Sequence, residues 1–61
     1  MNYELVTIRG NVYNFYHDET LCTAIEFIEV KANGSGFIVV TDEDEQQLYL
    51  KASEVITIRK M

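Results

Sequence analysis

A chain of 61 residues forms one domain at most, and so small a domain buries too little surface to be stable by a wide margin. Its ten acidic and five basic residues give a net charge of −5. That charge disfavours direct binding to DNA, RNA or an anionic membrane, because such binders cluster Lys and Arg against phosphates. One Cys and one His exclude a disulfide and a four-ligand zinc site.

The sequence gives no sign of a membrane segment or a secretory signal. Its longest run of aliphatic and aromatic residues, 37–40, is far too short to cross a bilayer, and the first residues lack the basic and apolar regions of a signal peptide. Small secreted domains are usually rich in disulfides, whereas this chain has only Cys22. We therefore expect a cytoplasmic protein that does not associate with membranes.

Short runs rich in β-branched and aromatic residues, separated by turn residues, predict strands over 3–9, 24–31, 37–41, 46–51 and 55–60. Residues 12–16 are predicted as a further short strand or as part of a long loop. The two glycines of 33–36 fit a four-residue hairpin loop, because glycine adopts positive φ without strain. Residues 42–45 fit a second hairpin, and 52–54 fit a tight turn.

The segment 19–32 is open to two interpretations. Asp18 suits a helix cap, Lys31 suits a last turn, and Gly34 suits the position just past a helix end. Its five β-branched residues weigh against a helix and favour a strand entered after a loop. The favoured fold class is therefore all-β: a five-stranded bent sheet or small barrel over residues 1–61. The alternative is an α+β fold of order ββαβββ, with a helix near 19–32.

The two ends of the chain carry nearly the same segment. Residues 4–9 (ELVTIR) recur as EVITIR at 54–59, with four of six positions identical. Laid antiparallel, Glu4 faces Arg59 and Arg9 faces Glu54. Opposite charges and β-branched pairs directly across a ladder each stabilise it by roughly 0.2–1 kcal/mol. We predict that the terminal strands pair antiparallel.

The predicted order of elements is a strand, a long Tyr-rich loop, three more strands with short connections, and a last strand beside the first. This layout resembles the Src-homology-3-like and Sm-like small barrels, in which the first and last strands also lie together. The resemblance covers the whole chain in element order and spacing. The chain has no Trp for a proline-peptide groove and no basic loop for an Sm-like RNA site, and such barrels host many unrelated functions.

The third predicted strand is apolar on both faces, with Ile38 and Val40 opposed to Phe37 and Val39. A sheet with one solvated face should alternate apolar with polar residues. One interpretation is a tightly curled barrel whose outer face is covered by loops. The other is a surface for a partner or for a second copy, since large exposed apolar patches mark interaction sites.

Asp42, Glu43, Asp44 and Glu45 form the most concentrated charge. They are either a solvated hairpin tip or a functional surface, which would hold a cation or mimic phosphates against a basic partner. The order of residues lacks the Asp-x-Asp-x-Asp-Gly pattern of an EF-hand loop. We expect no metal and no cofactor.

Aromatic residues supply the other candidate contacts, because Tyr offers a large contact area with few rotatable bonds. The candidates are Tyr3, Tyr13, Phe15, Tyr16 and Tyr49. The group at 13–16 lies in or beside the long loop, where binding residues tend to sit on small scaffolds. The alternative is that part of this group covers the mouth of the barrel.

No enzymatic activity is predicted. His17 and Cys22 are five residues apart, but no third group orients them and no oxyanion donors accompany them. The favoured function is a small acidic interaction or regulatory module with a protein partner. One version is an inhibitor that sets its acidic surface against a basic, nucleic-acid-binding protein, as small acidic proteins of phages and mobile elements often do.

Two other classes remain open. A homo-oligomer could bind a small molecule between its subunits, which predicts a ligand-dependent melting temperature. A nucleic-acid-binding barrel is disfavoured, because it needs the five bases to converge and the terminal ladder pairs Arg9 and Arg59 with glutamates.

Overall fold

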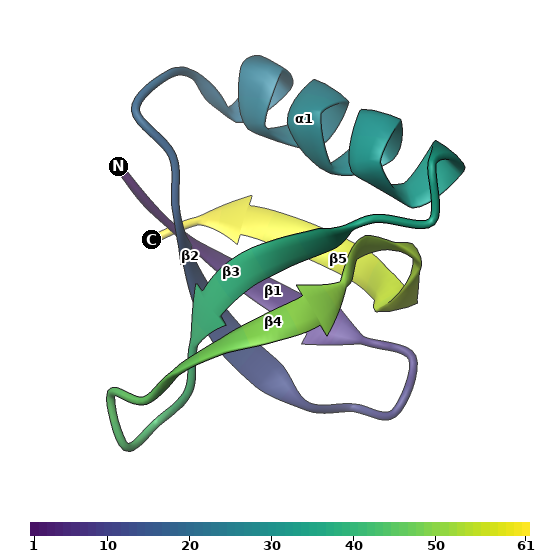
Figure 1. Cartoon of the computed structure of the whole chain (residues 1–61). Coiled ribbons are helices and arrows are strands. Elements are labelled where there is room, and N and C mark those ends of the chain that lie inside the picture. Colours follow the sequence, from purple (N-terminus) through teal and green to yellow (C-terminus); the bar gives the residue numbers. More distant parts are fainter.

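Five antiparallel strands and one helix follow one another in the order ββαβββ in the computed structural model, which describes all 61 residues (Figure 1). The elements are β1 (Asn2–Thr7), β2 (Val12–Tyr16), α1 (Leu21–Asn33), β3 (Phe37–Thr41), β4 (Gln47–Lys51), the single 3₁₀ turn η1 (Ala52–Glu54) and β5 (Val55–Lys60). The strand order in the sheet is β4-β3-β2-β1-β5, so β4 and β5 are its edges. The helix lies along one side of the curved sheet (Figure 1).

The predominantly β character and the strands at both ends of the chain are as predicted, whereas the strand expected over 24–31 is wrong. This segment forms α1, so the ββαβββ alternative is confirmed. Ala24 and Ile28, one turn apart, are buried against the sheet. The β-branched residues each lower helix propensity by only a few tenths of a kcal/mol, and tertiary burial of one helix face outweighs that cost.

The start of α1 differs from the helix alternative, whereas its end agrees with it, because Lys31 lies in the last turn and Gly34 is the C-cap. Thr20, not Asp18, caps the helix, since its side chain accepts a hydrogen bond from the Thr23 N–H at 3.4 Å. The expected hairpin loop at 33–36 is instead the helix end and the turn into β3. There the Gly34 N–H donates to Val30 O at 3.2 Å and the Gly36 N–H donates to Lys31 O at 2.7 Å.

The predicted terminal ladder is present over most of its length. Glu4 faces Arg59, Leu5 faces Ile58 and Val6 faces Thr57, as the repeated segments indicate. The Arg59 guanidinium donates to Glu4 Oε1 from Nε at 2.7 Å and contacts it from Nη2 at 2.6 Å.

The register shifts after Val6, so that Thr7 faces Val55 and Ile56 is an extra residue in β5. The predicted pairing of Arg9 with Glu54 is therefore wrong. The chain turns directly after β1 instead, where the Gly10 N–H donates to Thr7 O at 2.9 Å. A β-bulge of this kind inserts one unpaired residue and increases the local twist.

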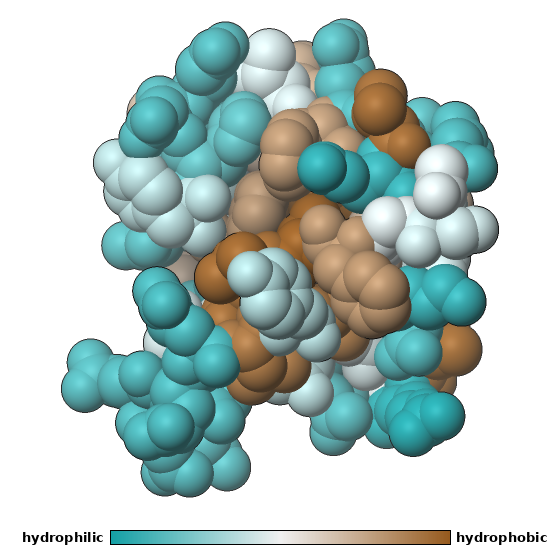
Figure 2. Space-filling model, viewed as in Figure 1, coloured by the Kyte–Doolittle hydropathy of each residue, from teal (hydrophilic) through white to brown (hydrophobic).

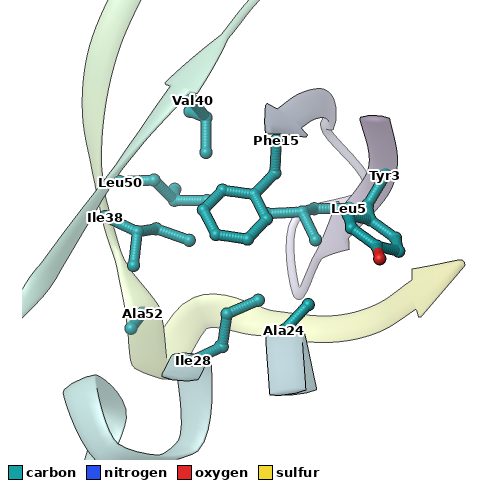
Figure 3. Packing of buried hydrophobic residues seen from close by; sticks show 9 residues of the cluster. All are labelled: Tyr3, Leu5, Phe15, Ala24, Ile28, Ile38, Val40, Leu50 and Ala52. Atoms are coloured by element: carbon teal, nitrogen blue, oxygen red, sulfur yellow. The ribbon is translucent and has the colours of Figure 1, made fainter. Parts of the chain in front are cut away.

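Nine buried side chains form the core: Tyr3, Leu5, Phe15, Ala24, Ile28, Ile38, Val40, Leu50 and Ala52. Figure 3 shows Phe15 between residues of β3 and β4 on one side and residues of β1 on the other, with the helix closing the cluster. The Tyr3 hydroxyl donates to Glu19 O at 2.7 Å and so fixes the chain that leads into α1. The curved sheet therefore wraps its inner face around one core.

Candidate interaction surface

The β3–β4 hairpin carries exposed apolar side chains on its outer face. Val39 lies directly opposite Tyr49, and Phe37 lies opposite Lys51. The alternate residues of both strands point inward to the core, which leaves Phe37 55%, Val39 48% and Tyr49 75% exposed. We call these three side chains the hairpin face. Figure 2 shows apolar surface gathered over β3 and β4 in the middle of this view.

The acidic loop (42–45) connects the two strands and projects from the lower left of the molecule (Figures 1 and 2). Asp42 builds the turn: its Oδ1 accepts from the Asp44 N–H and the Gln46 N–H, both at 2.9 Å. The Glu45 N–H donates to Asp42 O at 3.0 Å. Asp42 is thus a structural residue, while the carboxylates of Glu43, Asp44 and Glu45 are exposed to solvent.

Glu45 adopts a left-handed backbone conformation, with φ of 61°. For a residue with a Cβ this region costs about 1–2 kcal/mol relative to a right-handed conformation, so glycine or asparagine is usual there. The loop therefore keeps a carboxylate at a position where glycine would be more stable. Strain of this kind concentrates at functional sites.

The charge of the acidic loop is not neutralised within the chain. The pair between Arg59 and Glu4 is the one ion pair in the structure, so nine of the ten acids have no basic partner. Lys31 lies over the Phe27 ring, with Nζ 5.5 Å from its centroid. The loop consequently presents a concentrated negative potential at one end of the hairpin face.

The predicted aromatic residues separate into two groups. Phe15 and Tyr3 belong to the core, with 4% and 0% of their surface exposed, so their assignment to a binding face is wrong. Tyr13 is half-buried on the inner face and lines a shallow hollow beside Asp42 and Glu43. Tyr49 lies on the hairpin face, so the acidic loop and an exposed aromatic side chain belong to the same hairpin.

Tyr16 is 65% exposed at the end of β2. A hydrogen bond to the Asp18 carboxylate and the negative charge of that group raise the pKa of the Tyr16 phenol above its ordinary value of 10.0. Both effects favour the protonated phenol, because ionisation would place a second negative charge beside Asp18.

The candidate contact residues predicted from sequence do not include Phe37 and Val39, although one interpretation of the third strand makes an apolar face a surface for a partner. A signal for them is present, because the third strand is apolar on both faces and only one face can reach the core of a single curved sheet.

A second exposed apolar feature lies at the opposite edge of the sheet. Side chains of α1 and β5 line a groove formed by Ile25, Ile28, Glu29, Val55, Ile56, Thr57 and Ile58. We call it the α1–β5 groove. Ile56, the extra residue of the bulge, is 63% exposed there.

No group of three His, Cys, Asp or Glu side chains is placed to hold a metal ion. Cys22 is exposed on α1, whereas the His17 ring stacks on Phe15 with ring centroids 6.0 Å apart. None of the helices is long and apolar enough to cross a membrane.

Comparisons with known proteins found no match to this chain among family models, curated proteins or solved structures.

Proposed function

We propose that the chain is a non-enzymatic interaction module that binds a basic segment of a partner protein through the β3–β4 hairpin. The observation that carries this proposal is one hairpin with an exposed apolar face and three free carboxylates at its tip. Apolar contacts that lose water on binding supply affinity, and the carboxylates attract and orient a basic partner over a longer range. The strained Glu45 supports a role for the loop beyond connecting two strands.

The proposal includes a specific version, an inhibitor of a basic, nucleic-acid-binding protein in the cytoplasm. Carboxylates held on a defined loop can occupy positions that a basic groove otherwise offers to phosphates. The net charge of −5 and the absence of ion pairs at the loop support this version. It predicts that nucleic acid competes with this chain for the partner.

We further propose that the fold is Src-homology-3-like in layout. Support comes from β5 lying beside β1, from the strand order β4-β3-β2-β1-β5 and from the 3₁₀ turn before the last strand. In this layout α1 takes the place of the connection between β2 and β3. The layout carries no function by itself.

The test compares two variants with equal net charge. In the loop variant, Glu43→Gln, Asp44→Asn and Glu45→Gln remove three charges while Asp42 keeps the turn. In the control variant, Glu19→Gln, Glu26→Gln and Glu29→Gln remove three charges at and before α1. Partners captured from a cell lysate by each form are identified by mass spectrometry, and their affinities are measured at two salt concentrations.

We expect the loop variant to lose affinity on the order of tenfold or more, while the control retains it. Binding of the parent chain should weaken as salt rises, because exposed charges are screened. Tyr49→Ala should weaken binding at both salt concentrations, since its contribution is apolar. Equal losses in the loop and control variants would show that net charge alone matters and would overturn the proposal.

A second candidate function is a homo-oligomer that binds a small apolar molecule between its subunits. The α1–β5 groove favours it, because five of its seven lining residues are apolar. A ligand held there would raise the melting temperature of the chain, and Ile25→Lys would abolish the rise. A ligand effect unchanged by Ile25→Lys would exclude the groove.

A further inference from the structure

The second edge of the sheet, β5, has a free row of backbone groups. On one side β5 pairs with β1, and on the other side it has no strand. The Met61 N–H donates to Asn2 O at 3.2 Å and so faces β1. Because neighbouring residues of a strand point their N–H groups to opposite sides, the N–H groups of Lys60 and Ile58 face the free edge.

This edge has a bulge and two charged residues at its end, Arg59 and Lys60, but Val55, Ile56 and Ile58 before them are apolar. Proteins protect edges with proline, charged side chains, bulges or a covering element. The chain has no proline, and the bulge in β5 exposes an apolar side chain, Ile56, beside the α1–β5 groove. The edge and the groove together form one largely apolar surface over residues 55–58 of β5, before the two bases that end the strand.

The structure also shows which sequence pairs with β5. Its partner β1 is part of ELVTIR, and β5 itself is part of EVITIR, so β5 of a second copy closely repeats the strand that already pairs with it. An antiparallel alignment with Thr57 on the two-fold axis, one residue off the register of the β1–β5 ladder, brings Glu54 of each copy opposite Lys60 of the other. Neither residue has an ion-pair partner within its own chain.

We propose that two copies of the chain pair antiparallel through the free edges of β5 and join their sheets into one. The α1–β5 grooves then lie beside each other, and Ile56 of each copy is covered. Pairing with a second copy would also bury apolar surface that the single chain leaves exposed, since only 10 of its 61 residues are buried. This inference does not rest on the hairpin proposal, because β4 and β5 are opposite edges.

The hairpin edge does not suit a second copy in the same way. Its acidic loop carries three free carboxylates, so the loops of two approaching hairpins repel each other. Along β5, by contrast, an acid precedes the strand and bases end it. Charge complementarity therefore selects β5 as the surface that a second copy recognises.

The oligomeric state tests the proposal directly. Sedimentation velocity is measured from about 1 to 200 µM for the parent chain, for Ile56→Lys and for Ile8→Lys, since association through one interface depends on concentration. Ile8 and Ile56 are both 63% exposed, but Ile8 lies outside the α1–β5 groove, so the two variants differ in position alone. Circular dichroism confirms that each variant is folded.

We expect dimers for the parent chain and for Ile8→Lys, and at least a tenfold weaker association for Ile56→Lys. Lys60→Glu should weaken the dimer, and adding Glu54→Lys should restore it. A parent chain that stays monomeric, or an Ile56→Lys variant that dimerises as the parent does, would overturn the proposal.

Amide hydrogen exchange supplies a readout of the edge itself. Exchange at Ile58 and Lys60 should slow as the concentration rises, whereas Thr57 and Arg59, which face β1, should be protected at every concentration. Slower amide exchange along β4 instead of β5 would place the interface between copies on the β4 edge and would overturn the proposal. The affinity of the Ile56→Lys variant for the hairpin's partner distinguishes the two proposals. This variant should lose the dimer but keep its affinity for that partner.

Discussion

The two edges of the sheet differ in charge pattern more than in hydrophobicity. Each edge exposes a large apolar side chain, Tyr49 on β4 and Ile56 on β5. Four acids follow one another in the loop that leads into β4, whereas β5 has an acid before it and two bases at its end. A strand with opposite charges at its ends complements a second copy of itself, and a strand next to one block of charge does not. Edges with similar apolar content can therefore select different partners.

Both edges rest on the same core. Leu50 of β4 is part of the buried cluster, and Ile58 of β5 packs against it. The inner faces of these strands thus serve stability, while the outer side chains and free backbone groups are available for recognition. The predictions that follow test this division, from the largest expected effect to the smallest.

Leu5→Ala tests whether the two edges unfold as one unit. Leu5 is fully buried and faces Ile58 of β5 and Tyr13 of β2. Removing it should lower the free energy of unfolding by about 2–5 kcal/mol, because a cavity replaces buried contacts. Urea denaturation followed by circular dichroism measures the loss, and Val12→Ala, at an exposed site, should change stability by less than about 0.5 kcal/mol.

Hydrogen exchange in the Leu5→Ala variant then shows whether the β4 and β5 edges open together or separately. If the sheet is one cooperative unit, amide protons of β4 and β5 exchange faster by the same factor. Faster exchange confined to β5 would show that the terminal ladder opens separately. The two edges would then differ in local stability as well as in charge.

The terminal strands and the acidic loop are the parts that the sequence predicts best. The pairing of Glu4 with Arg59 follows from the repeated segment, because ladder partners are set by local charge and alternation. The bulge at Ile56 breaks the same register two pairs later. It depends on how the sheet curves around the core, which no short segment encodes.

The helix and the aromatic contacts depend on tertiary structure in the same way. Ala24 and Ile28 have helical spacing, but the β-branched residues around them weigh toward a strand until a sheet is present to bury that face. Phe15 and Tyr49 were equal candidates in sequence, yet one is buried and the other is 75% exposed. In strands that are apolar on both faces, composition does not determine which face turns inward.

Glu45→Gly measures the strain at the tip of the β4 edge. At φ of 61°, glycine avoids the clash that a Cβ creates, so Glu45→Gly should be about 1 kcal/mol more stable than Glu45→Ala. Both variants lose the same carboxylate, and charge effects therefore cancel in the comparison. Thermal and urea unfolding give the difference. At Glu43, whose φ is not positive, the alanine variant should be at least as stable as the glycine variant. If alanine is at least as stable as glycine at Glu45 too, the backbone there is not strained.

A double-mutant cycle at Glu4 and Arg59 examines the charges of the β5 ladder. Reversing both charges together should be tolerated better than either single reversal, with a coupling of about 0.2–1 kcal/mol. The coupling is small because the Arg59 side chain is 72% exposed. Urea unfolding in the Ile56→Lys background removes any contribution from self-association.

The chain contains its own control for this cycle. Arg9 and Glu54 have the same residue types in mirrored order, but the bulge prevents their pairing. Reversing their charges should give additive effects. Coupling at Arg9 and Glu54 as well as at Glu4 and Arg59 would mean that the ladder keeps the unshifted register in solution.

The smallest expected effect is a change in the pKa of Tyr16, which lies at the end of β2, between the two edge strands. Its pKa is raised by the hydrogen bond to Asp18 and by the charge of that carboxylate, so Asp18→Asn should lower the pKa toward 10.0. Because the folded-state pKa exceeds the unfolded one, the stabilisation is complete below about pH 10 and is lost as pH rises through the folded-state value. Nuclear magnetic resonance of the Tyr16 ring follows the titration, and Glu19→Gln should leave it unchanged.

The Asp18→Asn variant also tests how far the binding surface extends beyond the β3–β4 hairpin. Tyr16 is exposed but lies outside the β3–β4 hairpin, so Asp18→Asn should alter neither the affinity for a basic partner nor the dimer. A loss of partner affinity in Asp18→Asn would add the end of β2 to the binding surface. An identical Tyr16 titration in the parent chain and in Asp18→Asn would instead show that the phenol and the carboxylate do not interact in solution.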